Sequence, residues 1–337
     1  MTFPLNYQKA EATQISRNYH DAIAIGEETL EALGDQEVLI KNRYAGVNAS
    51  DVNLIAGQYF AGATLPFDLG FEFTGHVVAV GQSVDNHKVG DAVMGIKIGG
   101  GYREYVTLNQ AEAIPIPEAS PQLMSLLTVG LAASIGLKHV GEMKSDERVL
   151  VTAASGGVGH LAVQLAKQAG NHVIGTCGSD EKAQLLTELG CDRVINYHQE
   201  DLDKVLSEEY PEGINLIFEN VGGALFDTSL KHIAKLGRLV VCGFVSEYTS
   251  GAQPVEAPRI YHELLWKSAS VRAFLYSDFP ELIPQHLGEL IQLTAAQQLT
   301  VRVDPQEFVG LDRVSSAMDY LYQRKNTGRV VIKLNHD

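Results

Sequence analysis

The chain has 337 residues, of which 45% are apolar and 20% charged, and its formal net charge at pH 7 is −15. This composition indicates a globular protein with about two domains. The acidic balance argues against nucleic-acid or anionic-membrane partners, which need clustered Lys and Arg. Three widely spaced cysteines, Cys177, Cys191 and Cys242, form no CxxC pair, so we expect small buried side chains rather than disulfides or a zinc knuckle.

The ends and the hydropathy of the chain carry no membrane signal. The sequence has no run of eighteen apolar residues, so we expect no transmembrane helix. The first residues, MTFPLNYQKAEATQ, lack the basic and then apolar layout of a signal peptide. We therefore expect a cytoplasmic protein.

The first 120 or so residues are predicted to be rich in strands and turns. Residues 37–48 alternate in polarity and then turn, and residues 75–96 give short β-branched runs separated by Gly, Asn and Asp. Residues 124–140 have helical spacing and lead into a different pattern.

From residue 148 onward, apolar strands alternate with helical stretches. The predicted strands cover residues 148–153, 172–177, 193–197, 215–222, 237–244 and 269–276, with helices at 160–170 and 180–190. The tail adds a helix at 280–298 and a strand at 328–334. Buried parallel strands between helices describe an α/β protein with a doubly wound Rossmann sheet. We expect this domain over residues 125–275 and a β-rich domain over residues 1–124 and 276–337.

A glycine turn follows the first of these strands, in VTAASGGVGHLAVQLAKQAG at residues 151–170. It fits G-x-G-x-x-G with Ala in the first place, so Gly156 would let the backbone approach a pyrophosphate and Gly159 would let helix and strand pack closely. The free N–H groups at the helix start would face the phosphates. The alternative is a strand-to-helix turn without a ligand. The strand before and the helix after favour a dinucleotide. His160 is expected on the helix surface or at the pocket edge.

The residues after the second strand distinguish NADPH from NADH. An NAD site places an acid there to bind the ribose 2′-hydroxyl, but IGTCGS at residues 174–179 has no acid before Asp180. Small residues leave room for a 2′-phosphate, which Lys182 and Tyr197 could bind. Alternatively, Lys182 is an ordinary surface lysine, and Asp180 and Glu181 bind a bare ribose. The missing acid favours NADPH.

These motifs in this order resemble the zinc-independent branch of the medium-chain dehydrogenase/reductase superfamily. AASGGVG resembles the quinone oxidoreductases, and GTCGSDEKAQLLTELGCDRVINY, ENVGGALFD and KNTGRVVIKL resemble the prostaglandin reductase (type 3-like) and alkenal double-bond reductase group. The resemblance covers nearly the whole chain and implies a GroES-like first domain beside the Rossmann domain.

Carried over by position, the resemblance implies a set of NADPH contacts. The turn would hold the pyrophosphate, residues near the second and third strands the 2′-phosphate, and the ends of later strands and the tail the nicotinamide side. The implied residues are Ser155, Gly156, Gly157, Val158, Gly159, Thr176, Ser179, Lys182, Tyr197, Asn220, Cys242, Gly243, Phe244 and Asn326. For Asn220 and Phe244, a turn residue and a packing residue are the alternatives.

Zinc-containing relatives have Cys and His where this chain has Asn48 and Phe71. Neither residue is a good zinc ligand, so no metal is expected. Asp51 and Glu72 remain as polar anchors of the cleft or of the first domain.

Without a metal to polarise a carbonyl, an α,β-unsaturated ketone or aldehyde is the better acceptor, because hydride addition at the β-carbon leaves an enolate that needs only hydrogen-bond donors. Tyr59 is the expected donor, with a core or surface aromatic as the alternative reading, and Asn48 would orient the substrate or the ribose. Substrate-pocket candidates are Tyr248, Tyr261, Phe274 and Tyr276, with residues 246–258 as a mobile lid.

Two other functions stay open at this point. One is an NADPH:quinone oxidoreductase of the same fold, and the other is a non-catalytic NADPH-binding or sensing protein. The strand at residues 269–276 would form an apolar sheet edge, so we also expect a homodimer.

Overall fold

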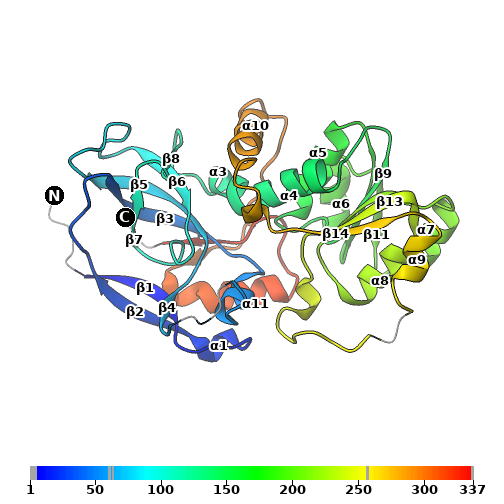
Figure 1. The fold of residues 1–337 in the computed structure, drawn as a ribbon, viewed down its shortest axis with the longest axis horizontal. Coiled ribbons are helices and arrows are strands. Elements are labelled where there is room, and N and C mark those ends of the chain that lie inside the picture. Colours follow the sequence, from blue (N-terminus) through cyan, green and yellow to red (C-terminus); the bar gives the residue numbers. More distant parts are fainter. Residues whose placement is uncertain (1–5, 60–61, 63, 256–257, 335–337) are drawn as a thin grey trace. The chain divides into compact units, whose positions relative to one another are not determined.

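A computed structural model describes residues 6–59, 62, 64–255 and 258–334. The chain divides into two compact units. Unit 1 comprises Met1–Thr128 and Val303–Asp337, and unit 2 comprises Val129–Arg302. Figure 1 shows strands in both units, with the parallel sheet in unit 2. The two-domain organisation expected from composition is therefore present.

Unit 2 is built on a parallel sheet in the order β11-β10-β9-β12-β13-β14. Its strands are β9 (Arg148–Val151), β10 (His172–Cys177), β11 (Arg193–Asn196), β12 (Ile214–Glu219), β13 (Ile233–Val241) and β14 (Ser270–Ala273). The chain runs outward from β9 to one edge and then returns to start β12 on the other side of β9. This reversal of direction is the doubly wound Rossmann order, and it confirms the predicted fold class.

Helices cover both faces of this sheet (Figure 1). They are α4 (Leu131–Ile135), α5 (Gly159–Gln168), α6 (Asp180–Glu188), α7 (Leu202–Glu209), α8 (Gly223–Lys231), α9 (Tyr261–Leu265) and α10 (Ile283–Ala295), with short turns η2 (Gly136–Val140), η3 (Val245–Glu247) and η4 (Tyr276–Asp278). Residues of α7 and α8 share one apolar core with β9 to β13. Right-handed connections between parallel strands place α5 and α6 on the opposite face.

Local signals explain where these helices begin and end. The Ser179 hydroxyl caps α6 by accepting from the Lys182 N–H at 3.3 Å, and the Asp201 carboxylate caps α7 in the same way. The chain turns after α5 and α6 at Gly170 and Gly190, which have φ of 83° and 99°. Glycine adopts this left-handed conformation without strain, so both predicted helices end near the glycines that marked them.

The tail helix α10 packs with unit 2, which corrects the predicted domain limit at residue 275. The buried Ser134 hydroxyl of α4 lies 2.7 Å from Nδ1 of the buried His286 on α10. Leu299 and Val301, farther along, are also buried. The apolar spacing of residues 280–298 predicted a helix, but such a pattern does not say which core the helix joins.

Unit 1 contains a mixed sheet, β15-β16-β3-β5-β6-β8 with β7 paired to β3, and a smaller antiparallel sheet, β2-β1-β4. The strands are β1 (Asn6–Ala12), β2 (Ile23–Thr29), β3 (Glu37–Gly46), β4 (Phe67–Asp68), β5 (Glu72–Val80), β6 (Ala92–Ile96), β7 (Tyr105–Asn109), β8 (Ile114–Pro115), β15 (Phe308–Val309) and β16 (Val331–Lys333). Its helices are α1 (Tyr19–Ala22), α2 (Asp51–Ile55), α3 (Pro121–Ser125), α11 (Val314–Tyr322) and the turn η5 (Leu311–Arg313). The C-terminal strand β16 pairs with β3, so the tail completes the first domain.

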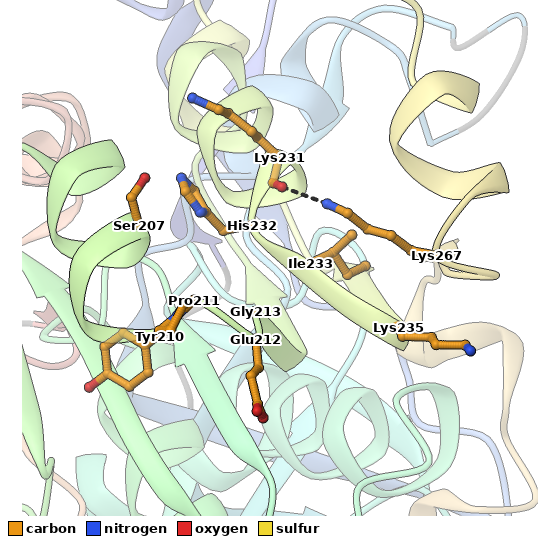
Figure 2. A pocket seen from close by; sticks show the side chains of 10 residues that line it. All are labelled: Ser207, Tyr210, Pro211, Glu212, Gly213, Lys231, His232, Ile233, Lys235 and Lys267. Atoms are coloured by element: carbon orange, nitrogen blue, oxygen red, sulfur yellow. Dashed lines mark hydrogen bonds between the residues drawn. The ribbon is translucent and has the colours of Figure 1, made fainter.

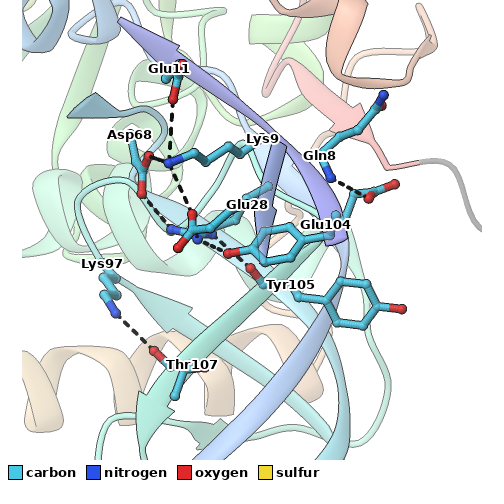
Figure 3. Close-up of polar contacts among 12 residues, drawn as sticks. Gln8, Lys9, Glu11, Glu28, Asp68, Lys97, Glu104, Tyr105 and Thr107 are labelled. Carbon is cyan, nitrogen blue, oxygen red and sulfur yellow. Dashed lines mark hydrogen bonds and ion pairs between the residues drawn. The ribbon is translucent and has the colours of Figure 1, made fainter. Parts of the chain in front are cut away.

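An ionic network links the small sheet of unit 1 to its neighbours (Figure 3). The Lys9 ammonium lies 2.6 Å from Asp68, 3.1 Å from Glu28 and 3.5 Å from Glu11. The Arg103 guanidinium pairs with Asp68 and Glu28 and donates to the Tyr7 hydroxyl. All these charges have partners within unit 1, so the network is structural.

Within the described ranges, Pro121–Val140 is the one helical stretch long and apolar enough to cross a membrane. It joins α3, the π-helical turn η1 (Leu126–Gly130), α4 and η2. Polar residues interrupt its apolar residues, so the stretch contains no run of eighteen consecutive apolar residues, although its average composition is apolar. Most of the stretch is buried inside the protein, as in the core helix of a globular domain.

Candidate functional site

The carboxyl ends of β9 to β13, here called the carboxyl edge, carry the predicted dinucleotide-binding residues. In a doubly wound sheet the ligand crevice lies where the strand order reverses, which is between β9 and β12 in unit 2. The glycine turn, residues 154–159, follows β9 at this point. A Cβ on Gly159 would stand 2.7 Å from the Ala154 Cα and would overlap the Ala153 carbonyl oxygen. Gly159 is therefore required for the close approach of helix α5 to the strand.

The end of β10 contacts the glycine turn and helps to fix its backbone. Ala153, with φ of 47°, donates its N–H to the hydroxyl of the buried Thr176 at the end of β10. This contact gives Thr176 a role in shaping the turn. The Ser155 side chain is buried, whereas Gly156, Gly157 and Val158 are partly exposed. The segment predicted to hold a pyrophosphate thus presents glycine backbone at the start of a helix, which suits an anion.

A buried carboxylate, Glu219, organises the reversal point. It accepts hydrogen bonds from the Thr152 hydroxyl at 3.0 Å and from the N–H groups of Val221 and Gly222 at 3.1 and 2.9 Å. Burial raises the pKa of Glu219, and these donors oppose that shift. Asn220 donates from its side chain to the Thr152 carbonyl at 2.8 Å. The carboxylate and the amide together fix the ends of β9 and β12 against each other.

The residues predicted to bind a 2′-phosphate lie at and after the end of β10. A Cβ on Gly178 would lie 2.5 Å from the Tyr197 hydroxyl, so that hydroxyl lies directly against the Gly178 backbone. Ser179 and Lys182 occupy the first turn of α6 beside it. Three of the predicted phosphate ligands, Ser179, Lys182 and Tyr197, therefore come from one small region of unit 2.

The Asp180 carboxylate, which could have bound a bare ribose, is engaged elsewhere. It accepts from Asn196 Nδ2 at 2.9 Å and from Gln199 Nε2 at 2.8 and 3.0 Å. Asn196 is buried at the end of β11, so it fixes the direction of the acid. This arrangement engages both carboxylate oxygens with side-chain amides, which favours the 2′-phosphate reading over ribose binding by Asp180.

The end of β13 brings together the residues predicted near the nicotinamide. The N–H groups of Cys242 and Gly243 both donate to the Glu219 carbonyl, at 2.8 and 3.2 Å. Phe244 is exposed, and its ring meets the buried Tyr248 ring edge-on at 4.7 Å between centroids. Burial raises the pKa of the Cys242 thiol to about 12, so it stays protonated. The carboxyl edge therefore ends in an aromatic pair beside a neutral thiol.

The other substrate-pocket candidates are spread over unit 2, and their role stays a prediction. Phe274 packs its ring against Gly136, where a Cβ would lie 2.6 Å from the ring. Tyr276 is partly buried and Tyr261 is exposed on α9. Of the predicted lid at residues 246–258, residues 256 and 257 lie outside the described residues.

Unit 1 holds a second group of polar side chains, the buried polar cluster, made of Asn48, Asp51, Glu72, Tyr102 and Arg329. The Tyr102 hydroxyl donates to Asp51 Oδ2 at 2.5 Å, and the Asn48 N–H donates to the same oxygen at 2.9 Å. Arg329 forms an ion pair with Glu72 and donates to the Val47 carbonyl at 2.9 Å. A Cβ on Gly46 would overlap this ion pair, so the glycine makes room for it. Asp51 and Glu72 are thus polar anchors of the first domain.

Charges in this cluster are incompletely matched. Burial raises the pKa of Asp51 to about 6, against the opposing bonds from Tyr102 and Asn48. Burial also lowers the pKa of Arg329 to about 10. Within the described residues, one oxygen each of Asp51 and Glu72 and the Nε of Arg329 form no hydrogen bond. The cluster holds two acids and one base out of water and is therefore sensitive to substitution.

Tyr59, the predicted hydrogen-bond donor to the carbonyl or enolate, lies beside this cluster. Its ring meets the buried Phe71 ring edge-on at 5.3 Å between centroids. Burial raises the pKa of Tyr59, a hydrogen bond with Ser50 lowers it, and the nearby Asp51 charge raises it. The hydroxyl is therefore protonated at neutral pH. Asn326 donates from its side chain to the Gly328 carbonyl at 2.9 Å, so its predicted cofactor contact stays untested.

No group of three or more His, Cys, Asp or Glu side chains in the described part of the chain is arranged to hold a metal ion. At the two positions where relatives with zinc carry ligands, the Asn48 amide makes only long contacts of 3.4 Å to the Gly46 carbonyl and Glu72, and Phe71 offers no donor atom. The donor chemistry of this place therefore does not suit zinc.

A hollow of about 370 Å³ opens at the opposite end of the unit 2 sheet, where β12 and β13 begin (Figure 2). Several basic residues line it, but most are already paired. Lys231 and His232 contact Asp203, and Lys267 donates to the Lys231 carbonyl at 2.7 Å. The hollow lies at the amino ends of the strands and is not part of the candidate site.

Several organising residues were not predicted from the sequence. Thr152, Glu219, Tyr102 and Arg329 gain their roles from partners that are distant in the chain. A buried acid directly after an apolar strand, as in IFEN, is the one local signal that could have pointed to Glu219. The expectation for His160 was wrong, because it is completely buried and bonded on both ring nitrogens.

Comparison with known proteins agrees with this geometry. A family model for the GroES-like domain of alcohol dehydrogenases matches residues 34–118, and one for zinc-binding dehydrogenases matches residues 157–292. Prostaglandin reductase-3 of Mus musculus is 42% identical over 99% of this chain and 91% of its own length. An NADP(+)-dependent 2-alkenal reductase of Nicotiana tabacum is 31% identical over 90% of this chain and 89% of its own.

Among solved structures, the Escherichia coli quinone oxidoreductase complexed with NADPH is similar, with a TM-score of 0.82 and 27% identity. The similarity covers 97% of this chain and 99% of that one. Sequence relatives over the full length and the matching fold lead to the same assignment. The chain belongs to the medium-chain dehydrogenase/reductase superfamily, in its quinone oxidoreductase and prostaglandin reductase branch.

Proposed function

We propose that this protein is an NADPH-dependent reductase of the carbon–carbon double bond of α,β-unsaturated ketones and aldehydes, lipid-derived enones included. The observation that carries the cofactor assignment is the engagement of Asp180 by Asn196 and Gln199 beside Ser179, Lys182 and Tyr197. An NADH site needs a free acid at this place, whereas a 2′-phosphate needs donors without a competing charge. The NADPH-bound bacterial relative and the NADP-dependent plant relative support this assignment.

The residues of unit 2 fit a dinucleotide. The glycine turn presents backbone N–H groups at the start of α5 for the pyrophosphate, and the absence of a Cβ at Gly156 leaves that backbone open. Ser179, Lys182 and Tyr197 would bind the 2′-phosphate. Glu219 and Asn220 hold the ends of β9 and β12, so the rest of the cofactor would rest on a fixed edge.

The acceptor follows from the donor chemistry of unit 1. Asn48 and Phe71 leave no zinc to polarise an isolated carbonyl, so a conjugated alkene is the better substrate. Bound NADPH would supply a hydride to the β-carbon, and a solvent-derived proton would complete the saturated product at the α-carbon. Tyr59, protonated at neutral pH, donates a hydrogen bond to the enolate oxygen, and Asn48 orients the substrate.

A quinone is the second candidate acceptor, because the similar E. coli protein is a quinone oxidoreductase. The test is anaerobic turnover of NADPH with a panel of enones, 2-alkenals and quinones, followed by mass analysis of the products. We expect a saturated carbonyl compound with a gain of two hydrogens. Faster turnover of quinones than of every enone would replace the proposal with the quinone function. Tight NADPH binding without any turnover would indicate a sensing role.

Tyr59 can be tested separately. Tyr59→Phe removes the hydroxyl and keeps the ring packed on Phe71, so the fold should be preserved. We expect kcat for enones to fall about 100-fold, within the range measured for lost donors to an oxyanion, with little change in the KM for NADPH. An unchanged kcat would exclude Tyr59 as the donor.

We also propose a homodimer formed along β14. This strand is the last in the sheet order, so its outer edge offers unpaired backbone groups to a second copy. Leu275 directly after it is half exposed, and Leu236, Leu265 and Trp266 are strongly exposed in the same unit. Sedimentation equilibrium should give twice the chain mass, and Val271→Pro should give the monomer. A monomeric wild-type protein would contradict this proposal.

A further inference from the structure

Three polar side chains project from one face of α5 toward a single stretch of backbone. They are His160, Gln164 and Gln168, which are spaced by four residues and so share a helix face. Each contacts the non-helical stretch at residues 298–302, which follows α10 and ends unit 2. We call the three side chains and this stretch the α5 ladder.

The contacts of the α5 ladder form a regular series. The Gln164 side chain donates to the Thr300 carbonyl at 2.9 Å and accepts from the Thr300 N–H at 2.8 Å, as a neighbouring strand would. Gln168 donates to the Gln298 carbonyl at 2.6 Å. The Arg302 N–H donates to His160 Nε2 at 3.1 Å. Alternate residues 298, 300 and 302 therefore face the helix.

The geometry of the two elements makes this series possible. Four residues of α-helix rise about 6 Å, and two residues of non-helical chain span at most about 6.6 Å. Every fourth helical side chain can therefore meet every second backbone group of this stretch, which bends at residues 298 and 299. The intervening residues, Leu299 and Val301, are buried, which fixes the stretch in this register.

His160 connects this ladder to the glycine turn. Because Nε2 accepts a hydrogen bond, Nδ1 carries the proton and donates to the Gly156 carbonyl at 2.9 Å. The ring is completely buried, and burial lowers its pKa to about 4, so it is neutral. One imidazole thus joins a carbonyl of the pyrophosphate-binding turn to the last residue of unit 2.

We propose that His160 is a positioning residue that couples the glycine turn to residues 298–302, where the chain passes from unit 2 to unit 1. A dinucleotide that orders the turn will then also order this connection, and by thermodynamic linkage a disordered connection will weaken dinucleotide binding. The inference rests on the proposed function only in requiring that a dinucleotide binds at the turn.

The test is hydrogen exchange of the full-length protein with and without NADP⁺, read from a peptide that covers residues 298–302. We expect NADP⁺ to slow exchange of the Thr300 and Arg302 amides at least threefold in the wild type. His160→Asn can keep the bond to Gly156 but cannot reach Arg302, so it should lose this protection. Gln184→Leu, an exposed glutamine on α6 bonded to Glu188, is the matched control and should keep it.

His160→Leu removes both bonds and should raise the KM for NADPH about tenfold with less than a threefold change in kcat. Equal protection in His160→Asn and the wild type would overturn the coupling. An unchanged KM for NADPH in His160→Leu would overturn the positioning role. If His160→Leu does not fold, His160→Asn alone decides. Failure of wild-type protein to bind NADP⁺ in calorimetry would instead reject the proposed function.

Discussion

The carboxyl edge of unit 2 and the buried polar cluster of unit 1 organise polar groups in opposite ways. At the carboxyl edge, the one fully buried acid, Glu219, is surrounded by backbone and hydroxyl donors, and the turn beside it is neutral backbone. In the buried polar cluster, Asp51, Glu72 and Arg329 are charged and share few donors. At the carboxyl edge both oxygens of the buried acid accept hydrogen bonds, whereas the buried polar cluster keeps charged groups with unmatched atoms.

This difference predicts which property, ligand affinity or stability, a substitution in each region reduces. A preorganised edge loses ligand affinity when its shape changes, because its own hydrogen bonds remain. A buried charged cluster loses stability when any member is removed, because the remaining charge has no partner. Substitutions in the two regions should therefore separate binding from folding.

The largest effect is expected from Arg329→Leu. It leaves Glu72 completely buried without its ion-pair partner and removes a donor to the Val47 carbonyl. Breaking a buried pair on one side costs about 3–5 kcal/mol. Urea unfolding should show this loss in the free energy of unfolding.

The double variant Glu72→Gln with Arg329→Leu is the control. Because it removes the uncompensated charge, it should be more stable than Arg329→Leu alone. Equal stability of the single variant and the wild type would show that the ion pair is not a feature of the folded protein in solution.

The same contrast explains which parts of the site could be predicted. The glycine turn, the small residues after β10 and the strand order of unit 2 come from contiguous segments with strong periodicity. Ser179, Lys182 and Tyr197 are close in sequence as well as in space, and their grouping followed from the motif and the resemblance. The fold class was predicted for the same reason.

The buried polar cluster could not be assembled in this way. Asn48, Asp51, Glu72, Tyr102 and Arg329 come from four separate segments, and no local pattern pairs Glu72 with a residue 257 positions away. His160 was misjudged because its partner, Arg302, lies 142 residues later. The predicted domain limit at residue 275 differs for a similar reason. Residues 276–302 join unit 2 through contacts such as Ser134 with His286, which their helical periodicity does not show.

The pH dependence of stability gives the next largest effect. His160 has a depressed pKa of about 4 in the folded protein, against 6.5 when unperturbed, through burial and the nearby Arg302 charge. A depressed value means that the unfolded chain binds the proton more tightly, so this contribution is present above about pH 6.5 and lost as pH falls to about 4. At about 1.4 kcal/mol per pKa unit, the full loss amounts to about 3.5 kcal/mol once the pH is below about 4.

The measurement is urea unfolding at pH 7.5 and 4.5 in the wild type and in His160→Asn. The wild type should lose about 2.5 kcal/mol more than the variant between these values. Asp51 titrates in the same range with a raised pKa and so acts in the opposite direction, but it is common to both proteins. Identical pH profiles would show that His160 is not held neutral.

Two glycine substitutions test whether shape alone governs the carboxyl edge. In Gly159→Ala, the new methyl group overlaps backbone of Ala153 and Ala154, so we expect a loss of about 1–3 kcal/mol of stability and weaker NADPH binding. In Gly156→Ala, the nearest atom is the Ala153 carbonyl oxygen at 3.3 Å, so stability should change little while binding still falls. Thermal unfolding and NADPH titration separate the two. Equal destabilisation by both would contradict the assigned roles of the glycines.

The smallest effect concerns the direction of Asp180. Gln199→Ala removes one of the two amides that hold this carboxylate and is exposed, so the fold should tolerate it. A freer acid would repel a 2′-phosphate and bind a 2′-hydroxyl, so the preference for NADPH over NADH in kcat/KM should fall up to about tenfold, or about 1.4 kcal/mol. Adding Asp180→Asn should restore the preference, because the charge is then gone. An unchanged preference in Gln199→Ala, with activity retained, would mean that Asn196 alone fixes the acid, and the contribution of Gln199 would be excluded. A restored preference would show that the Asp180 charge, and not the loss of the Gln199 side chain itself, weakens NADPH binding.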